Sequence, residues 1–233
     1  MRWFLIAVGA VISGVVFDTA VPSVSVAGPV VIQGAGGSFS LPTVSLKEKR
    51  WTNVVGQQYD FSCGSAAVAT LLTHHYGFPV TEQAVFQQMY EHGDQAKIRT
   101  EGFSLLDMKR FLEAQGFQAD GFKQPLDKLN EARVPAIVLI NSDGYHHFVV
   151  VKGVQDDRVL LGDPAMGTRA MPRKVFESKW QNGLLFVIHN RMESARFNVA
   201  ADWRAAPRAP VGTGLARNGM TDISLPKLGP GDF

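Results

Sequence analysis

Apolar positions in the first half of the chain recur at the spacing of amphipathic helices. Residues 63–76 open with small side chains and continue with aliphatic ones on one face, which predicts a helix. Residues 81–90 predict a second helix with Thr81 as its N-cap, and residues 104–115 predict a third that opens with a serine–aspartate cap pair. The stretch 91–103 is polar and aperiodic, so it predicts a loop.

The second half of the chain has a different pattern, with continuous β-rich apolar runs separated by turn residues. These runs predict strands at 135–140, 146–154, 158–163 and 183–188, with a short helix at 172–180. Because the helices come first and an antiparallel meander follows, the pattern favours an α+β fold in which N-terminal helices pack on an antiparallel sheet.

The first 27 residues have the pattern of a secretory signal peptide. Arg2 precedes an apolar run that is too short to span a bilayer comfortably, which takes about 20 residues. Small residues favour cleavage after Ala27, and Ala20 is a poorer site because Asp18 would lie three residues before the cut. An uncleaved anchor or a buried strand are the alternatives. We expect export to the periplasm, with membrane contact only through this segment.

Composition shifts divide the rest of the chain. Residues 28–50 are rich in Gly, Ser and Val and predict a flexible arm or an edge strand, and residues 51–189 carry the periodic patterns of one compact domain. Residues 190–233 form a C-terminal tail that is rich in Ala, Pro, Arg and Gly without periodicity, and roughly residues 200–233 of it are predicted to be extended or disordered.

The overall composition is that of a globular protein, with 45% hydrophobic and 19% charged residues and a formal net charge of +2. There is no long basic run, so nucleic-acid binding has little support. The adjacent histidine pairs His74–His75 and His146–His147 lack the i, i+4 spacing of a helical zinc motif, and no phosphate-binding loop or dinucleotide fingerprint occurs. We therefore expect no metal and no cofactor.

Cys63 is the only cysteine in the chain, so no intramolecular disulfide can form. An unpaired thiol in an exported protein is either buried and inert or present for its reactivity. The predicted helix N-terminus favours the thiolate, and its free N–H groups could hold an oxyanion. The alternative is that Cys63 packs in the core as a small hydrophobic residue.

A reactive thiolate needs an imidazole partner and an orienting group. His74 and His75 would lie roughly 16 Å along the same helix and cannot reach Cys63. The pair 146–147 stands at the head of a predicted strand, and alternation allows only one of the two to face the thiol. Asp163 ends the next strand, where it could fix that ring; the alternative is an ordinary turn residue before a proline.

Three separate motifs, in order, resemble one family. They are "QQYDFSCGSAAVATLL", "HHFVVVKGV" and "LLGDPAMG". They are similar to those of the bacteriocin-processing cysteine peptidases, papain-like enzymes that cut leader peptides after double-glycine motifs. The resemblance covers about residues 51–189. The matching positions are Gln57, Cys63-Gly64, His147-Phe148 and Asp163-Pro164.

The resemblance implies a papain-like fold and a role for each matched polar residue. Cys63 would be the nucleophile, His147 the general base and acid, and Asp163 the group that orients the imidazole. The side-chain amide of Gln57 would complete the oxyanion hole with the backbone N–H of Cys63.

The resemblance, not the spacing, selects Gln57 over Gln58 and His147 over His146. The sequence departs from the family pattern at Ser62, where an aspartate is common, which bears on leader specificity more than on catalysis. Some family members are fused to ABC exporters. This chain begins with an export signal instead and resembles the stand-alone exported peptidases of functional-amyloid secretion systems.

The resulting prediction is a periplasmic cysteine endopeptidase that cleaves a protein or peptide of a secretion pathway through an acyl-thioenzyme. A catalytically silent, peptidase-like module that binds a secreted peptide is the alternative from another class. A related thiol reaction, such as amide transfer or deamidation, is a third.

Overall fold

The structure is a computed structural model that describes residues 30–34, 37–41, 44–142 and 144–208. The predicted signal peptide, with both of its candidate cleavage sites, lies outside the described residues. So does the last part of the predicted tail, residues 209–233. The chain divides into two units, and the first contains an antiparallel hairpin of β1 (Val30–Gly34) and β2 (Gly37–Leu41).

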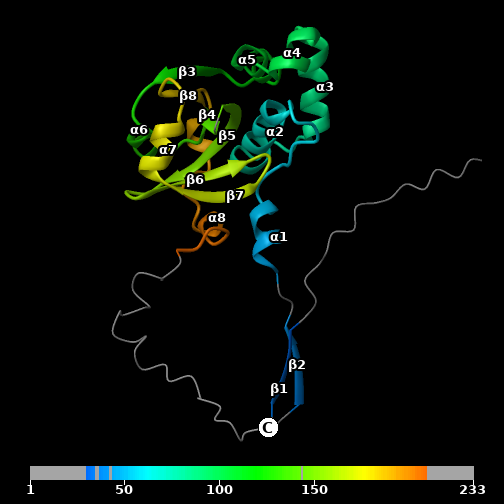
Figure 1. Cartoon of the computed structure of the whole chain (residues 1–233), viewed down its shortest axis with the longest axis vertical. Helices are drawn as coiled ribbons and strands as arrows, with labels where there is room; N and C mark the ends of the chain where they lie inside the picture. Colours follow the sequence, from blue (N-terminus) through cyan, green and yellow to red (C-terminus); the bar gives the residue numbers. More distant parts are fainter. Residues whose placement is uncertain (1–29, 35–36, 42–43, 143, 209–233) are drawn as a thin grey trace, which may run out of the picture. The chain divides into compact units, whose positions relative to one another are not determined.

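The second unit is built on a six-stranded antiparallel sheet with the order β3-β8-β4-β5-β6-β7. The strands β4, β5, β6 and β7 form an antiparallel meander, of which the sequence predicted the first three and missed β7, and β8 returns to pair between β3 and β4 (Figure 1). The strands are β3 (Ala119–Lys123), β4 (Ala136–Ser142), β5 (Tyr145–Val154), β6 (Arg158–Asp163), β7 (Gly167–Pro172) and β8 (Leu184–Ile188).

Four of the helices gather on one side of this sheet (Figure 1). They are α2 (Cys63–Thr70), α3 (Glu82–His92), α4 (Gln95–Glu101) and α5 (Leu105–Ala114), and α2 continues into a π-helical turn, η1 (Leu71–His75). Every residue of α2 is buried, so this helix is the centre of the core on this side. Its packing against β5 brings the N-terminus of α2 to the sheet.

Two short helices cover the other side of the sheet, α6 (Asp127–Ala132) and α7 (Arg173–Lys179). Leu129 from α6 and Phe176 from α7 pack with alternate residues of β4, β5 and β6 in a second core cluster. The sheet is therefore buried on both faces, which explains why its central strands read as continuous apolar runs. The α+β architecture predicted from the sequence is confirmed.

Three local predictions are wrong. The stretch 91–103 contains a helix, α4, whose start is capped by the Asp94 side chain accepting from the Lys97 N–H. The segment 28–50 contains most of a capped helix, α1 (Leu46–Trp51), and not only an arm or an edge strand. The predicted tail contains a 3₁₀ turn, η2 (Met192–Ser194), and a helix, α8 (Ala200–Trp203). No helix in the described ranges is both long and apolar enough to cross a membrane.

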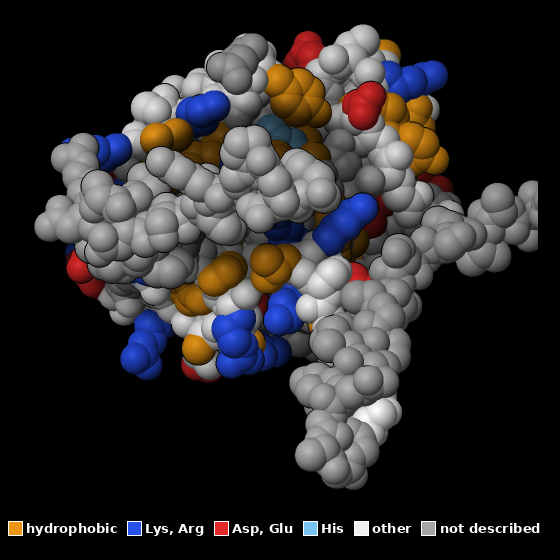
Figure 2. Space-filling view, turned by 60° about the horizontal axis from the view of Figure 1, so that its bottom comes forward, with side chains coloured by type: hydrophobic (Ala, Val, Ile, Leu, Met, Phe, Trp, Pro, Cys, Tyr) orange, Lys and Arg blue, Asp and Glu red, His pale blue; other side chains and the backbone are white. Residues whose placement is uncertain are grey.

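The C-terminal segment is fixed to the sheet by a buried ion pair. The Lys152 side chain is fully buried at a bulge in β5, and its Nζ lies 3.1 Å from a carboxylate oxygen of Asp202 in α8. The same Nζ donates to the Asn53 carbonyl oxygen at 2.9 Å. On the face that shows β6, β7 and α8, Lys and Arg side chains lie among hydrophobic ones (Figure 2).

Candidate active site

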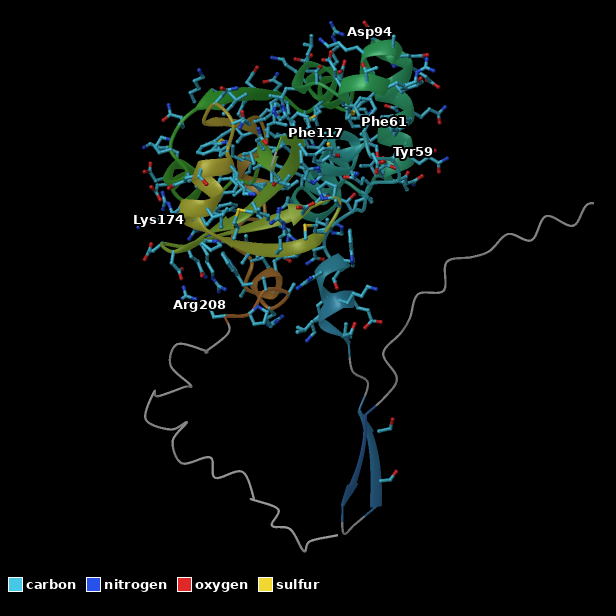
Figure 3. The ribbon with its side chains drawn as sticks, in the orientation of Figure 1. Tyr59, Phe61, Asp94, Phe117, Lys174 and Arg208 are labelled. Atoms are coloured by element: carbon cyan, nitrogen blue, oxygen red, sulfur yellow. The ribbon has the colours of Figure 1, made fainter. Side chains whose placement is uncertain are left out.

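Cys63 is the first residue of α2 and is 6% exposed. A tight turn delivers the chain to this point, because the Ser62 hydroxyl accepts from the Tyr59 N–H and the Ser62 N–H donates to the Tyr59 carbonyl. Figure 3 shows Tyr59 and Phe61 on this approach, beside α2 and α3. The sulfur therefore lies at the positive end of a buried helix, where the free N–H groups of the first turn favour an anion.

The glycine after the nucleophile position allows close packing of α2. A Cβ at Gly64 would lie 2.8 Å from Met108 Cε and 3.0 Å from Phe103 Cβ. Any larger residue would push α2 away from its neighbours and displace the adjacent thiol. The Cys-Gly pair is therefore a packing requirement as well as a motif.

His147 and Asp163 meet across the neighbouring strands β5 and β6, as the strand pattern predicted. The Nε2–H of His147 donates to Oδ1 of Asp163 at 2.8 Å, and the two residues are only 5% and 1% exposed. His146, the other histidine of the pair, is exposed. The structure thus brings the ring of residue 147, and not that of 146, to the carboxylate.

The other ring nitrogen of His147, Nδ1, does not bond to Asp163. Nδ1 is buried without a hydrogen-bond partner of standard geometry among the described residues, but the Cys63 side chain lies near enough to interact with the ring. Burial alone would lower the pKa of His147, yet the hydrogen bond to Asp163 and the interaction with Cys63 outweigh it and raise the pKa to about 9. The imidazole is therefore protonated at neutral pH and can give a proton to a leaving group.

Asp163 has a full set of partners. Oδ1 also accepts from the backbone N–H groups of Ala165 and Met166 at 2.9 and 3.2 Å, and Oδ2 accepts from Arg169 Nε at 2.9 Å. Burial would raise the pKa of Asp163, but its bond to His147 and the nearby charges of His147 and Arg169 hold the pKa below its usual range. The carboxylate therefore stays ionised and fixed in orientation.

The turn after Asp163 is held by the segment that precedes the nucleophile. The Gln57 N–H donates to the Pro164 carbonyl at 3.0 Å. Gly167 has a φ of +76°, and a Cβ there would lie 2.9 Å from the Arg50 carbonyl oxygen of α1. Helix α1, which the sequence did not predict, thus packs closely on the start of β7, where Gly167 pairs with Asp163.

Gln57 lies in the same region, but its amide differs from the predicted arrangement. Nε2 donates to the Tyr59 carbonyl at 3.0 Å and to the Asp60 carbonyl at 3.5 Å, while Oε1 is buried without a partner among the described residues. The two N–H groups of the amide are thus directed at backbone carbonyls. A role in an oxyanion hole is open to Gln57 only after a rotation of the side chain.

The structure adds two residues that sequence reasoning did not assign. One is Arg169, which contacts Asp163 as described. The other is Tyr145, whose ring stacks on His147 with centroids 5.8 Å apart. The two-residue period of strands is a signal that could have found it, because residues 145 and 147 point to the same side. Within the described ranges, no group of three or more His, Cys, Asp and Glu side chains could hold a metal ion.

Comparison with known proteins places these residues in a family context. A model described as "Peptidase C39 family" matches residues 51–192. The chain is 43% identical over 153 residues to a protein of Pseudomonas aeruginosa named "Probable functional amyloid protease FapD". The aligned part is 66% of this chain and 67% of that protein. A protein of the same name from Pseudomonas fluorescens is 42% identical over 154 residues, 66% of this chain and 68% of the relative.

Solved structures of similar fold include the peptidase domain of Streptococcus ComA, a bifunctional ABC transporter of a quorum-sensing pathway. The likeness has a TM-score of 0.49 and 23% identity, and it covers 58% of this chain and 97% of that domain.

Proposed function

Because this chain belongs to the peptidase C39 family of cysteine peptidases, we propose that it is a periplasmic endopeptidase that cleaves an exported protein, with Cys63 as its nucleophile. The observation that carries the proposal is the set of contacts around His147. This ring is bonded to the ionised Asp163 on one side and interacts with the only thiol of the chain on the other. Such an arrangement is what thiol acyl transfer requires.

The proposed reaction has two stages. The Cys63 thiolate attacks the carbonyl carbon of the scissile peptide, and the imidazolium of His147 gives its proton to the leaving amine as the C–N bond breaks. This leaves an acyl-thioenzyme and a free amine. The neutral imidazole then takes a proton from water, the resulting oxygen attacks the thioester, and the thiolate leaves as the acid product forms.

The charge that develops on the carbonyl oxygen needs donors. The Cys63 backbone N–H, at the first position of α2, has no intrahelical acceptor, and the Gln57 amide, after a rotation of its side chain, is the other candidate. The names of the Pseudomonas relatives support a substrate in functional-amyloid secretion. Cleavage after a double-glycine motif and export by residues 1–27 are parts of the same proposal.

The proposal is tested by comparing the exported proteins of strains that carry the wild-type chain, Cys63→Ala, His147→Ala or His146→Gln. We expect a cleaved fragment to disappear, with its precursor accumulating, in the first two variants. The exposed His146 is the matched control, and its variant should keep the fragment. Identical fragment patterns in all four strains would contradict the peptidase proposal.

A second measurement separates the alternatives. If purified Cys63→Ala chain binds an exported protein as tightly as the wild type and neither cleaves it, the chain is a silent binding module. A change in the mass of the substrate without scission would instead indicate amide transfer or deamidation.

A further inference from the structure

Tyr145 is the first residue of β5 and joins the two sides of the candidate active site. Its hydroxyl donates to the Asp60 carbonyl oxygen at 2.8 Å, although the two residues are 85 positions apart. Asp60 belongs to the approach to Cys63, and Tyr145 belongs to the strand that carries His147. This hydrogen bond therefore connects the thiol side of the site directly to the histidine side.

The ring of Tyr145 also lies against the ring of His147. It stacks on the His147 ring at a centroid distance of 5.8 Å and an interplanar angle of 29°. Burial raises the pKa of the phenol, and the nearby charges of Cys63 and Asp60 raise it further. An interaction with the Gln57 side chain acts in the opposite direction. Tyr145 is thus close to all the groups that would perform the proposed reaction.

The exposure of Tyr145 shows that this contact is not part of the core. Its side chain is 51% exposed, whereas Cys63 and His147 are 6% and 5% exposed. A half-exposed aromatic ring that is held at the surface by its hydroxyl and by stacking on one neighbour can rotate away without unpacking the sheet. The reacting groups have no such freedom.

We infer that Tyr145 is a substrate-selecting residue, which covers the sulfur until an extended polypeptide displaces it from Asp60. The inference rests on the proposed function for its substrate class. A backbone N–H of the substrate would replace the phenol at the Asp60 carbonyl, so that no hydrogen bond is lost on opening. A small molecule without such a donor would have to break that bond without replacing it. The thiol is thereby shielded from small reagents and open to a polypeptide.

The test is the rate at which Cys63 reacts with N-ethylmaleimide, a small reagent that carries no hydrogen-bond donor. Because the full chain has a single cysteine, the increase in intact mass reports this thiol alone. Tyr145→Phe keeps the ring and removes the hydroxyl. We expect its alkylation rate to rise by about threefold to tenfold, since a net hydrogen bond is worth about that factor. Tyr59→Phe is the matched control, since Tyr59 is equally exposed at 51% and its hydroxyl bonds to no described residue.

The pH dependence of alkylation separates access from reactivity. If Tyr145 controls access, the plateau rate rises in Tyr145→Phe while the midpoint pH stays where it is in the wild type. A shifted midpoint with an unchanged plateau, or equal rates in the two Phe variants, would overturn the inference. Alkylation needs no substrate, so this result is independent of whether the chain cleaves a protein.

Discussion

At the scale of single residues, the charge on His147 sets the pH range of the proposed reaction. Its pKa of about 9 lies above the ordinary value of 6.5, so the ring is protonated at neutral pH. The stabilisation that this gives the fold is complete below pH 6.5 and is lost as pH rises through about 9. We therefore expect the rate of substrate cleavage to fall on the alkaline side near pH 9, as the proton for the leaving amine is lost.

Asp163→Asn tests that account. Without the carboxylate, burial of His147 dominates and its pKa falls, so the alkaline limb of the kcat/KM profile should move to lower pH. We also expect kcat/KM to fall on the order of 10²-fold, the smaller end of what general acid–base catalysis contributes. An alkaline limb that stays near pH 9 in this variant would show that another group controls it.

Arg169 is expected to act through Asp163. Arg169→Gln removes the donor to Oδ2, so the pKa of Asp163 should rise and the acid limb of the pH–rate profile should move to higher pH. We expect kcat to fall by about tenfold or more with little change in KM, since a hydrogen bond to a charged group contributes about 1.5–3 kcal/mol and each 1.36 kcal/mol is about a factor of ten in rate. Arg169→Lys should recover part of the loss by restoring the charge.

Arg173→Gln is the matched control for that prediction. The two arginine side chains are similarly exposed, at 23% and 22%, and both pair with carboxylates. The partners of Arg173 are Asp127 and Glu177, which are themselves exposed, so its pairs contribute little. If the two variants lose activity equally, the role of Arg169 is structural and not a positioning role.

The sequence was sufficient to place some site residues and not others, for a physical reason. His147 and Asp163 end neighbouring strands of a short meander, so local patterns bring them together. Arg169 lies on a strand, β7, whose sequence GTRAMP has no apolar run, and the pattern left it unassigned. The bond of Tyr145 to Asp60 spans 85 residues, and no local periodicity encodes such a contact.

At the scale of elements, periodicity found the helices α2, α3 and α5, which each bury several residues, and missed α4 and α6, which each bury one. The capped helix α5 buries Met108, Phe111 and Leu112, and its predicted Ser104–Asp107 capping box is present. Helix α4 buries only Ile98, and α6 buries only Leu129. One apolar anchor in six or seven residues gives no helical period, so these helices depend on their caps and on tertiary packing.

The π-helical end of α2 gives a prediction at this scale. His75 is fully buried there, its Nδ1 pairs with the Arg196 carbonyl at 2.6 Å, and its Nε2 has no partner among the described residues. Burial lowers its pKa to about 4. The ring is neutral in the folded chain, and the unfolded chain takes up a proton first as pH falls below 6.5.

Acidification from pH 6.5 to 4 should therefore cost about 3 kcal/mol of folding stability through His75 alone. Urea unfolding at a series of pH values measures this cost. His75→Asn keeps a donor for the Arg196 carbonyl and should flatten the dependence over that interval. His92→Asn is the control, because the exposed His92 makes the same kind of contact to the Gln88 carbonyl. Equal slopes for wild type and His75→Asn would contradict the prediction.

At the scale of the whole molecule, the segment after the matched family region completes the fold. The match ends at residue 192, but Asp202 lies beyond it and neutralises Lys152 inside it. Composition predicted a tail for this segment. The ion pair joins two residues that are 50 positions apart in the sequence, and such a contact leaves no local pattern. Figure 3 shows Arg208 near the end of this segment, where its ion pair with Asp157 lies on the surface.

Asp202→Asn should destabilise the chain by about 3–5 kcal/mol, the cost of leaving one partner of a buried ion pair alone. Burial lowers the pKa of Lys152, and removing the negative charge of Asp202 should lower the pKa of Lys152 further. The variant should therefore recover stability as pH rises and the amine becomes neutral.

Adding Lys152→Met to Asp202→Asn removes the unpaired charge and should restore most of the unfolding free energy at neutral pH. Arg208→Ala breaks an ion pair whose two side chains are 62% and 59% exposed. This control should change the free energy of unfolding by less than about 1 kcal/mol. If the double variant is as unstable as Asp202→Asn, the C-terminal segment is held by its other contacts and not by this pair.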